Sequence, residues 1–275
     1  MLRRFLYKKV SNWVFPNKGI THIKREPKLI VSLTSYPKRI NVVPLVIDSL
    51  LRQSLKPDMV ILWLAEDEFP EKERNLPKTL LRYVKFGLTI RWYHNIRSYK
   101  KIIPALSFYP NDIIVTADDD SIYPEYWLER LYISYIHSPK EIHCHHAFQM
   151  KLDKNYNILG REIRTAPGNL MPNEHAVGIG GILYPPHLLL QEAQNESTFI
   201  ANAPTDDDMW MWAMERIAGT PIRLVDNHTD NIVCIDDVQS DGLVSINAAG
   251  EGGHQFANLL DRYPMLKEGL SPQKD

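Results

Sequence analysis

Four apolar runs of strand length, with helix-like segments between them, constrain how this chain can fold more than any other feature. The runs occupy residues 28–35, 59–65, 88–94 and 112–117. Strands that alternate with helices indicate a parallel sheet, because parallel neighbours need a long crossover connection. The runs are continuously apolar, which is typical of strands covered on both faces. The sequence therefore predicts an α/β fold with a Rossmann-type, mostly parallel sheet flanked by helices.

The remaining elements are predicted from periodicity and from breakers. We expect helices over 42–53, 72–84, 99–109, 124–138, 206–219 and 254–264. Further strands are expected over 141–150 and 221–225, and the glycine-rich stretch 178–186 leads into a strand or a turn. The polar segment 151–176 is interpreted as a long loop region.

Length and composition exclude several classes of protein. The chain has 275 residues, of which 44% are apolar, which is enough for one large domain. Its formal net charge of −1 gives no general attraction to nucleic acid. Two cysteines, Cys144 and Cys234, suggest no disulfide framework. No apolar stretch approaches the roughly 20 residues of a membrane span, and no signal peptide is recognised, so a cytoplasmic location is expected.

The N-terminal residues 1–20 form a separate predicted unit. Apolar side chains recur at helical spacing, four basic residues fall between them, and Pro16 ends the pattern. Such a basic amphipathic helix can lie in a membrane interface, which would place the protein at the cytoplasmic face of the inner membrane. The alternative, which we favour, is that the helix packs against its own domain; the sequence leaves both interpretations open.

Three consecutive aspartates, Asp118, Asp119 and Asp120, follow the fourth apolar run. In a parallel α/β sheet, ligands bind outside the carboxyl ends of the strands. Residues i and i+2 of an extended segment project to the same side. We therefore expect Asp118 and Asp120 to coordinate one cation together, while the side chain of Asp119 points to the other side. Mg²⁺ or Mn²⁺, shared with a diphosphate, would offset the repulsion between the carboxylates. The alternative is a solvated acidic turn.

With these pieces in order, the chain resembles the nucleotide-sugar-dependent glycosyltransferases of the GT-A fold, particularly the bacterial family 2-like enzymes. The resemblance spans roughly residues 28 to 263. It rests on TSYPKR after the first strand, YKKIIPAL, the DDD strand end, GIGGILYPP, and PTDDDMW before a helix. It implies one GT-A-like domain over 21–265, with a nucleotide-binding half at about 28–120 and an acceptor half at about 121–265. A flexible tail, 266–275, would follow.

The resemblance also implies roles on the donor side. In such enzymes the DxD aspartates hold the metal bound to the donor diphosphate, a role that passes to Asp118 and Asp120. Asp119 would then face the donor ribose or sugar. A family lysine or arginine near Lys100 and Lys101 contacts the donor phosphates, and Arg39 lies where the nucleotide pocket begins.

Two further family features are matched less closely. The stretch containing Gly180 and Gly181 resembles the glycine-rich segment that lines the sugar and acceptor cleft. Enzymes of this fold often use a downstream histidine as a further metal ligand, a role for which His254 is the candidate and His228 a weaker rival. The HCHH stretch (143–146) is interpreted as plain strand residues, because no second cluster completes a tetrahedral site.

The catalytic base is expected in PTDDDMW, since related enzymes carry an acidic motif at the start of a helix downstream of the DxD. Successive side chains at a helix start point about 100° apart, so the three aspartates cannot all face one cleft. Asp206 is the better helix cap. Asp207 is therefore the first candidate for the base and Asp208 the second, with a pKa raised by neighbouring negative charge.

The leading hypothesis is a metal-dependent hexosyltransferase that uses Mn²⁺ or Mg²⁺. It would move a sugar from a nucleoside-diphosphate donor, with a UDP-sugar favoured, to a bacterial surface glycan such as lipopolysaccharide or capsule. The acceptor would be a glycan or a lipid-linked glycan, and the transfer would be inverting.

One alternative is a haloacid-dehalogenase-like phosphatase, because residues 118–122 approximate its DxDx(T/V) signature. That signature normally opens the domain, however. A non-catalytic glycan- or nucleotide-binding module is the other alternative.

Overall fold

The computed structural model describes residues 18–226, 232–235 and 243–272. The amphipathic helix predicted for residues 1–20 falls almost wholly on residues 1–17, outside the described residues, and so does His228. Within the described ranges, no helix is long and apolar enough to cross a membrane.

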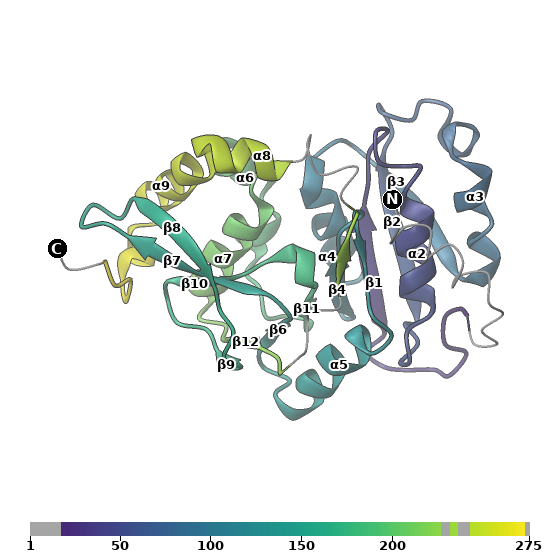
Figure 1. The fold of residues 1–275 in the computed structure, drawn as a ribbon, viewed down its shortest axis with the longest axis horizontal. Helices are drawn as coiled ribbons and strands as arrows, with labels where there is room; N and C mark the ends of the chain where they lie inside the picture. The colour runs from purple at the N-terminus through teal and green to yellow at the C-terminus, as the bar shows by residue number, and fades with distance from the viewer. Residues whose placement is uncertain (1–17, 227–231, 236–242, 273–275) are drawn as a thin grey trace.

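The four strands predicted first are present and pair in parallel (Figure 1). They are β1 (Leu29–Thr34), β2 (Met59–Ala65), β3 (Leu88–Tyr93) and β4 (Ile113–Ala117). An eight-stranded sheet of order β3-β2-β1-β4-β11-β6-β12-β9 is completed by β6 (Ile142–Cys144), β9 (Gly168–Asn169), β11 (Ile182–Tyr184) and β12 (Ile222–Leu224). β11 runs antiparallel to both of its neighbours, so the sheet is mixed but mostly parallel. The predicted fold class is confirmed.

Both faces of this sheet are buried, as the continuously apolar strands predicted. Along β1, Leu29, Val31 and Leu33 belong to one core cluster, while Ile30 belongs to another. The first cluster is covered by α2 (Val43–Leu51), α3 (Lys78–Leu81) and α5 (Trp127–His137). The opposite face is covered by α4 (Ile103–Phe108), α6 (Glu196–Asn202), α7 (Asp207–Ala218) and α9 (Gly252–Arg262). This layered burial fixes the strand ends that carry the site.

Short helical turns connect these elements. They are η1 (Lys72–Asn75), η2 (Val84–Phe86), η3 (Arg97–Lys101), η4 (Gly178–Gly180), η5 (Gln191–Gln194), α8 (Leu243–Ile246), the π-helical turn η8 (Asn247–Glu251) and η9 (Pro264–Lys267). The single helix predicted over 72–84 is divided into η1, α3 and η2. Pro77 explains the first break, because it disfavours a helical conformation at Leu76, which is extended.

The middle of the chain differs most from the prediction. The expected strand 141–150 is two strands, β6 and β7 (Ala147–Leu152), which belong to different sheets. The expected loop 151–176 supplies β8 (Ile158–Ile163), β9 and β10 (Glu174–Ala176), and a three-stranded sheet forms in the order β10-β7-β8. These strands are short or exposed on one side, so their sequences lack a continuous apolar run. The expected tail 266–275 is packed as far as Leu270, because Leu266 and Leu270 are buried in the core.

A close contact between Gly181 and Trp127 holds α5 against the end of η4. Gly181 has a φ of +85°, and a Cβ placed on it would lie 2.4 Å from the indole ring of Trp127. The Trp127 indole N–H donates to the carbonyl of Gly180 at 2.6 Å. A side chain at Gly181 is therefore excluded both by its backbone conformation and by space.

We expect Gly181→Ala to lower the free energy of unfolding by about 2–4 kcal/mol, because overpacking adds to the strain of a positive φ. Urea unfolding followed by circular dichroism would measure it. Gly219→Ala is the matched control, since Gly219 has a φ of +67° but open space around its Cβ position. That variant should lose only about 1–2 kcal/mol. Equal losses in the two variants would show that the indole contact is unimportant.

Candidate active site

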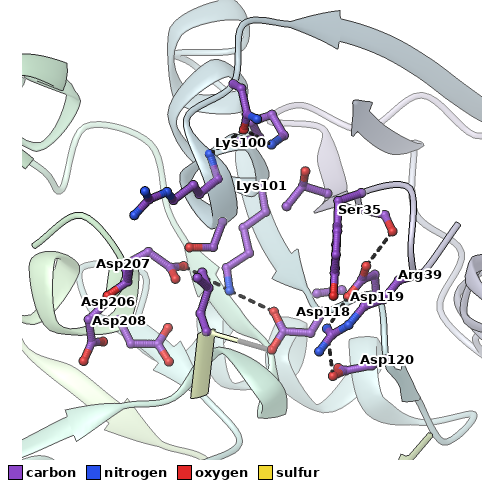
Figure 2. Close-up of a pocket in the computed structure, with 18 of the residues that line it drawn as sticks. Ser35, Arg39, Lys100, Lys101, Asp118, Asp119, Asp120, Asp206, Asp207 and Asp208 are labelled. Carbon is purple, nitrogen blue, oxygen red and sulfur yellow. Dashed lines mark hydrogen bonds and ion pairs between the residues drawn. The ribbon is translucent and has the colours of Figure 1, made fainter. Parts of the chain in front are cut away.

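A cavity of about 420 Å³ opens where the parallel strands β1 and β4 end (Figure 2). Its walls come from the segments that follow β1, β3 and β4, from η3 and from the N-terminus of α7. The cavity brings together the predicted residues Arg39, Lys100, Lys101, Asp118, Asp119, Asp120, Asp207 and Asp208. The site thus lies outside the carboxyl ends of the strands, which is where an open α/β sheet binds its ligands.

The three aspartates after β4 are paired with side-chain cations. Arg39 Nη1 lies 2.8 Å from Asp119 Oδ1 and 2.9 Å from Asp120 Oδ2, and the hydroxyl of Ser35 donates to Asp119 Oδ2 at 2.5 Å. Asp118 Oδ1 accepts from the Lys101 ammonium at 2.8 Å. Two cations of the protein therefore offset much of the repulsion that the sequence led us to assign to a metal ion.

The expected alternation of these side chains is wrong. β4 ends at Ala117, and Asp119 and Asp120 lie in a turn rather than in an extended segment. In this turn both carboxylates reach the same guanidinium, while Asp118 points toward Lys101 (Figure 2). Pairing of β5 (Ser121–Ile122) with β13 (Val233–Cys234) stabilises the turn, and the N–H of Ile235 donates to the carbonyl of Asp120 at 2.7 Å.

Burial makes this cluster electrostatically costly. Burial, followed by the charge of Asp118, raises the pKa of Asp120 to about 6, against the opposing effect of Arg39. Burial also raises the pKa of Asp119, against the opposing effects of Arg39 and Ser35. An additional cation near Asp118 and Asp120 would therefore be favourable.

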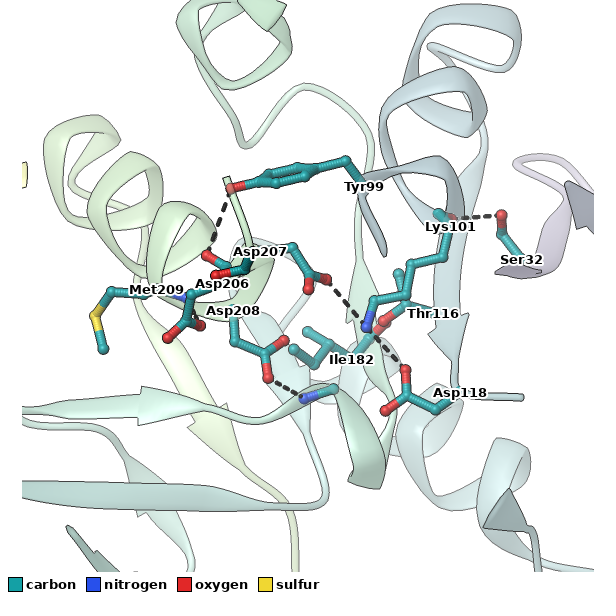
Figure 3. A network of polar contacts seen from close by, with 12 residues as sticks. Ser32, Tyr99, Lys101, Thr116, Asp118, Ile182, Asp206, Asp207, Asp208 and Met209 are labelled. Carbon is teal, nitrogen blue, oxygen red and sulfur yellow. Dashed lines mark hydrogen bonds and ion pairs between the residues drawn. The ribbon is translucent and has the colours of Figure 1, made fainter. Parts of the chain in front are cut away.

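Lys101 connects the aspartates after β4 to those at the start of α7 (Figure 3). Its Nζ lies 2.8 Å from Asp118 Oδ1 and 3.0 Å from Asp207 Oδ2, and its side chain is only 8% exposed. Burial by itself would lower the pKa of this ammonium, but the charges of Asp118, Asp207 and Asp208 raise it well above its usual value. Lys101 is therefore a permanently charged group inside the cavity.

The N-terminus of α7 holds its three aspartates in three different environments. The side chain of Asp206 accepts from the N–H of Met209 at 3.1 Å, so the prediction that Asp206 caps the helix is confirmed. Asp207 faces Lys101. Asp208 Oδ2 accepts from the N–H of Gly178 at 3.0 Å, and burial followed by the charge of Asp207 raises the pKa of Asp208 to about 8. From the sequence we expected neighbouring negative charge to raise the pKa of the base candidate. The structure shows this effect at Asp208, which was the second candidate.

Lys100 occupies another part of the cavity. Its Nζ donates to Asn95 Oδ1 at 3.0 Å, and burial lowers its pKa, which the carboxylates of Glu68 and Asp67 partly offset. Within the described residues, the buried atoms Glu68 Oε2 and Ser98 Oγ have no hydrogen-bond partner. All of these residues except Asp67 line the cavity, so this end offers unused polar groups to a ligand.

Three predicted site residues do not line the cavity. A Cβ on Gly180 would lie 2.7 Å from the backbone nitrogen of His146, and Gly181 packs against Trp127, so both glycines serve close packing. His254 is exposed on α9. Among the described residues, no group of three or more histidine, cysteine or acidic side chains is arranged to hold a metal ion. The HCHH stretch is among these described residues and forms no such group.

Several cavity residues were not predicted, although a signal existed for some of them. Tyr36, Glu68 and Asn95 follow β1, β2 and β3, so extending the strand-end rule to every strand would have found them. Gly178 does not line the cavity, but its N–H donates to Asp208; it belongs to the same glycine-rich stretch as Gly180 and Gly181, which were predicted in its place. Asn247 carries no such signal, because it reaches the cavity by contact with Thr205.

Comparisons with known proteins identify the architecture. No family model matches the chain, and no curated protein matches it by sequence. The fold is similar to that of the mannosyltransferase PcManGT from Pyrobaculum calidifontis, solved in complex with GDP-Man and Mn²⁺. The identity is 12%, the TM-score is 0.55, and the match covers 98% of this chain and 72% of that one. The resemblance to enzymes of the GT-A fold is therefore confirmed for the fold itself.

A second structure is similar at a lower level. The inositol-1-phosphate CTP transferase from T. maritima is 12% identical, with a TM-score of 0.44, over 88% of this chain and 96% of that one. This likeness is too weak to support an argument about the site.

Glu215 lies on α7 behind the cavity and is 1% exposed. Its Oε1 has no hydrogen-bond partner among the described residues. Burial, followed by the charge of Asp208, raises the pKa of Glu215 to about 8, against the opposing effect of the Tyr184 hydroxyl. The side chain is therefore mostly neutral at pH 7.

This raised pKa predicts a dependence of stability on pH. Between about pH 4.5 and 8 the folded state keeps the proton of Glu215 while the unfolded state releases it, so this contribution to stability falls as the pH rises. Glu215→Gln lacks the titration. Its stability relative to wild type should rise by about 1.4 kcal/mol per pH unit, at most, from pH 5 to 8 and then level off. Urea unfolding across this range would measure the change.

The exposed residue Glu71 provides the control, because Glu71→Gln should follow the wild type at every pH. A constant difference between Glu215→Gln and wild type from pH 5 to 9 would contradict the assignment.

Proposed function

We propose that this protein is a metal-dependent glycosyltransferase that moves a sugar from a nucleoside-diphosphate donor to the hydroxyl of a glycan acceptor, with inversion. The observation that carries the proposal is that carboxylates from the end of β4 and from the start of α7 face one cavity, with Lys101 between them. The GT-A-like fold supports the proposal, since PcManGT, which has a similar overall architecture, was solved in complex with a nucleotide sugar and Mn²⁺. A bacterial surface glycan, free or lipid-linked, remains the proposed acceptor.

The donor diphosphate would lie against Asp118 and Asp120. Among the described residues, each carboxylate forms its ion pair through a single oxygen, so the other could bind a cation. Two protein carboxylates suit Mg²⁺ or Mn²⁺, because such ions complete their shell with substrate phosphates and water. A bound ion would neutralise charge on the departing diphosphate. Arg39, Lys100 and Lys101 add fixed positive charge beside it.

Asp207 would act on the acceptor side as the general base. Its Oδ2 lies 3.0 Å from the Lys101 ammonium, and its side chain lines the cavity. In the proposed transfer Asp207 accepts the proton of the acceptor hydroxyl, the oxygen attacks the anomeric carbon, and the bond from that carbon to the diphosphate oxygen breaks. Asp208, with a pKa of about 8, is mostly protonated at pH 7 and is the weaker candidate.

The competing functions are less well supported. A haloacid-dehalogenase-like phosphatase needs its aspartate signature after the first strand, whereas here it follows β4, and the overall fold is similar to a GT-A enzyme. A non-catalytic binding module would not need the second group of carboxylates at α7.

The first test is a panel of GDP-mannose, UDP-glucose, UDP-galactose and UDP-N-acetylglucosamine with Mn²⁺, in which release of the nucleoside diphosphate is measured. We expect one donor to be consumed, faster when a glycan acceptor is added, because attack by a hydroxyl completes the transfer. EDTA should abolish the release. Tight donor binding without release from any donor would favour the binding module, and release of inorganic phosphate would favour the phosphatase.

Two variants link this activity to the proposed donor site. Asp118→Asn and Asp120→Asn should weaken Mn²⁺-dependent binding of the nucleoside diphosphate in calorimetry, while Asp261→Asn, at an exposed position on α9, should not. Unchanged affinity in both site variants, with and without Mn²⁺, would remove the metal role from these residues.

Asp207→Asn should lower kcat by about 10²-fold or more while the donor KM stays nearly constant, because an amide cannot accept the proton. Asp208→Asn should have a smaller effect. Initial rates at saturating donor would separate the two variants. The base would be reassigned to Asp208 if the order of the losses were reversed, and an inverting mechanism would be untenable if neither variant lost activity.

A further inference from the structure

Lys101 is held in place from both ends of its side chain. Its carbonyl accepts from the Ser32 hydroxyl at 2.6 Å, and the Trp63 indole N–H donates to that same hydroxyl oxygen at 2.9 Å, so β1 and β2 fix its backbone. At the other end, its ammonium is bound by Asp118 and Asp207 (Figure 3). Little freedom is left to this buried side chain, which is unusual for a lysine.

Gly178 provides the space that the ammonium occupies. A Cβ on Gly178 would lie 2.7 Å from Lys101 Nζ and 3.0 Å from Asp208 Oδ1. Its backbone N–H also donates to Asp208. Any larger residue here would press on the charged end of Lys101 and on Asp208, whereas no backbone atom stands in the way.

We propose that Lys101 is a positioning residue for the catalytic base: its ammonium, seated against Gly178, holds the Asp207 carboxylate at a fixed place relative to Asp118. This inference rests on the proposed function, since it assigns to Lys101 a task on the acceptor side in addition to any contact with donor phosphates. One ammonium contacts a carboxylate on each side of the reaction centre, so it sets how far the proton acceptor lies from the diphosphate.

Such positioning matters because catalysis is sensitive to small displacements. A general base must lie within hydrogen-bond distance of the hydroxyl that attacks, and a shift of about 1 Å can cost roughly 10²-fold in rate. Within the described residues, Asp207 has no other ion pair of 4 Å or less. Loss of the Lys101 contact would therefore leave the orientation of this carboxylate to the helix start alone.

Gly178→Ala tests the inference without removing any charge. The nearest atoms to the new methyl group are the ends of flexible side chains, Lys101 and Asp208 closely and Asp118 at 3.6 Å, so the fold should survive while the ammonium is displaced. We expect kcat to fall by about 10- to 100-fold, with the affinity for GDP or UDP in the presence of Mn²⁺ changed less than about twofold. The control is Gly160→Ala on β8, whose Cβ position has nothing within 4 Å and which should keep wild-type kcat.

A double-mutant cycle shows whether Lys101 acts through Asp207. Lys101→Met should lower kcat strongly in the wild type but add less than about threefold to the loss in Asp207→Asn, because the group that it positions is already inactive. Losses that multiply independently would overturn the inference. So would a Gly178→Ala variant whose whole loss is recovered at saturating donor, since Lys101 would then serve donor binding only.

The two levels of proposal fail in different ways. If Asp207→Asn keeps normal turnover, the proposed base and the task of Lys101 both fall. If Asp207→Asn is inactive while Gly178→Ala and Lys101→Met keep normal kcat, the proposed function stands and only the inference about Lys101 is wrong. The cycle is run with the donor that the panel identifies, and a panel without any active donor overturns both.

Discussion

Charge compensation by Arg39 and Lys101 is the interaction on which the site depends. Carboxylates from the end of β4 and from the start of α7 face a common cavity, and buried like charges of this kind are costly unless they are paired. Arg39 binds two of them and Lys101 binds two others. Lys101 contacts carboxylates of both elements, so its charge offsets the repulsion between the two sides of the cavity, while Arg39 compensates the side that follows β4.

The same compensation separates the tasks of the acidic residues. Asp118 and Asp207 are paired with Lys101, whereas Asp208 lies beside them with a pKa raised to about 8 by burial and by the charge of Asp207. Burial and distance from a cation thus give neighbouring groups of the same type different electrostatic environments, which is how acid and base roles are divided at many active sites. The further residues Gly178 and Ser32 fix the geometry in which this division holds.

How much could be predicted from the sequence varied with the type of signal. The strands β1 to β4 carry long apolar runs, and their ends placed Asp118 and Arg39 at one edge of the sheet, whereas Lys101 was predicted from the family resemblance. The strands β8, β9 and β10 were missed: β9 and β10 are only two and three residues long, and β8 is largely exposed, so none carries a periodic apolar pattern. His254 and Gly180 were carried over from a family pattern, and the structure places the first in solvent and the second against His146.

The sequence by itself determined the fold class, the edge of the sheet at which a ligand would bind and the aspartate that caps α7. These follow from apolar periodicity, from strand ends and from local capping, all of which act over a few residues. Only the tertiary structure decided which cation meets which carboxylate. Lys101 and Asp207 are far apart in the sequence, and their contact, like the space that Gly178 leaves for it, exists only because packing of α7 and η3 on the sheet brings them together.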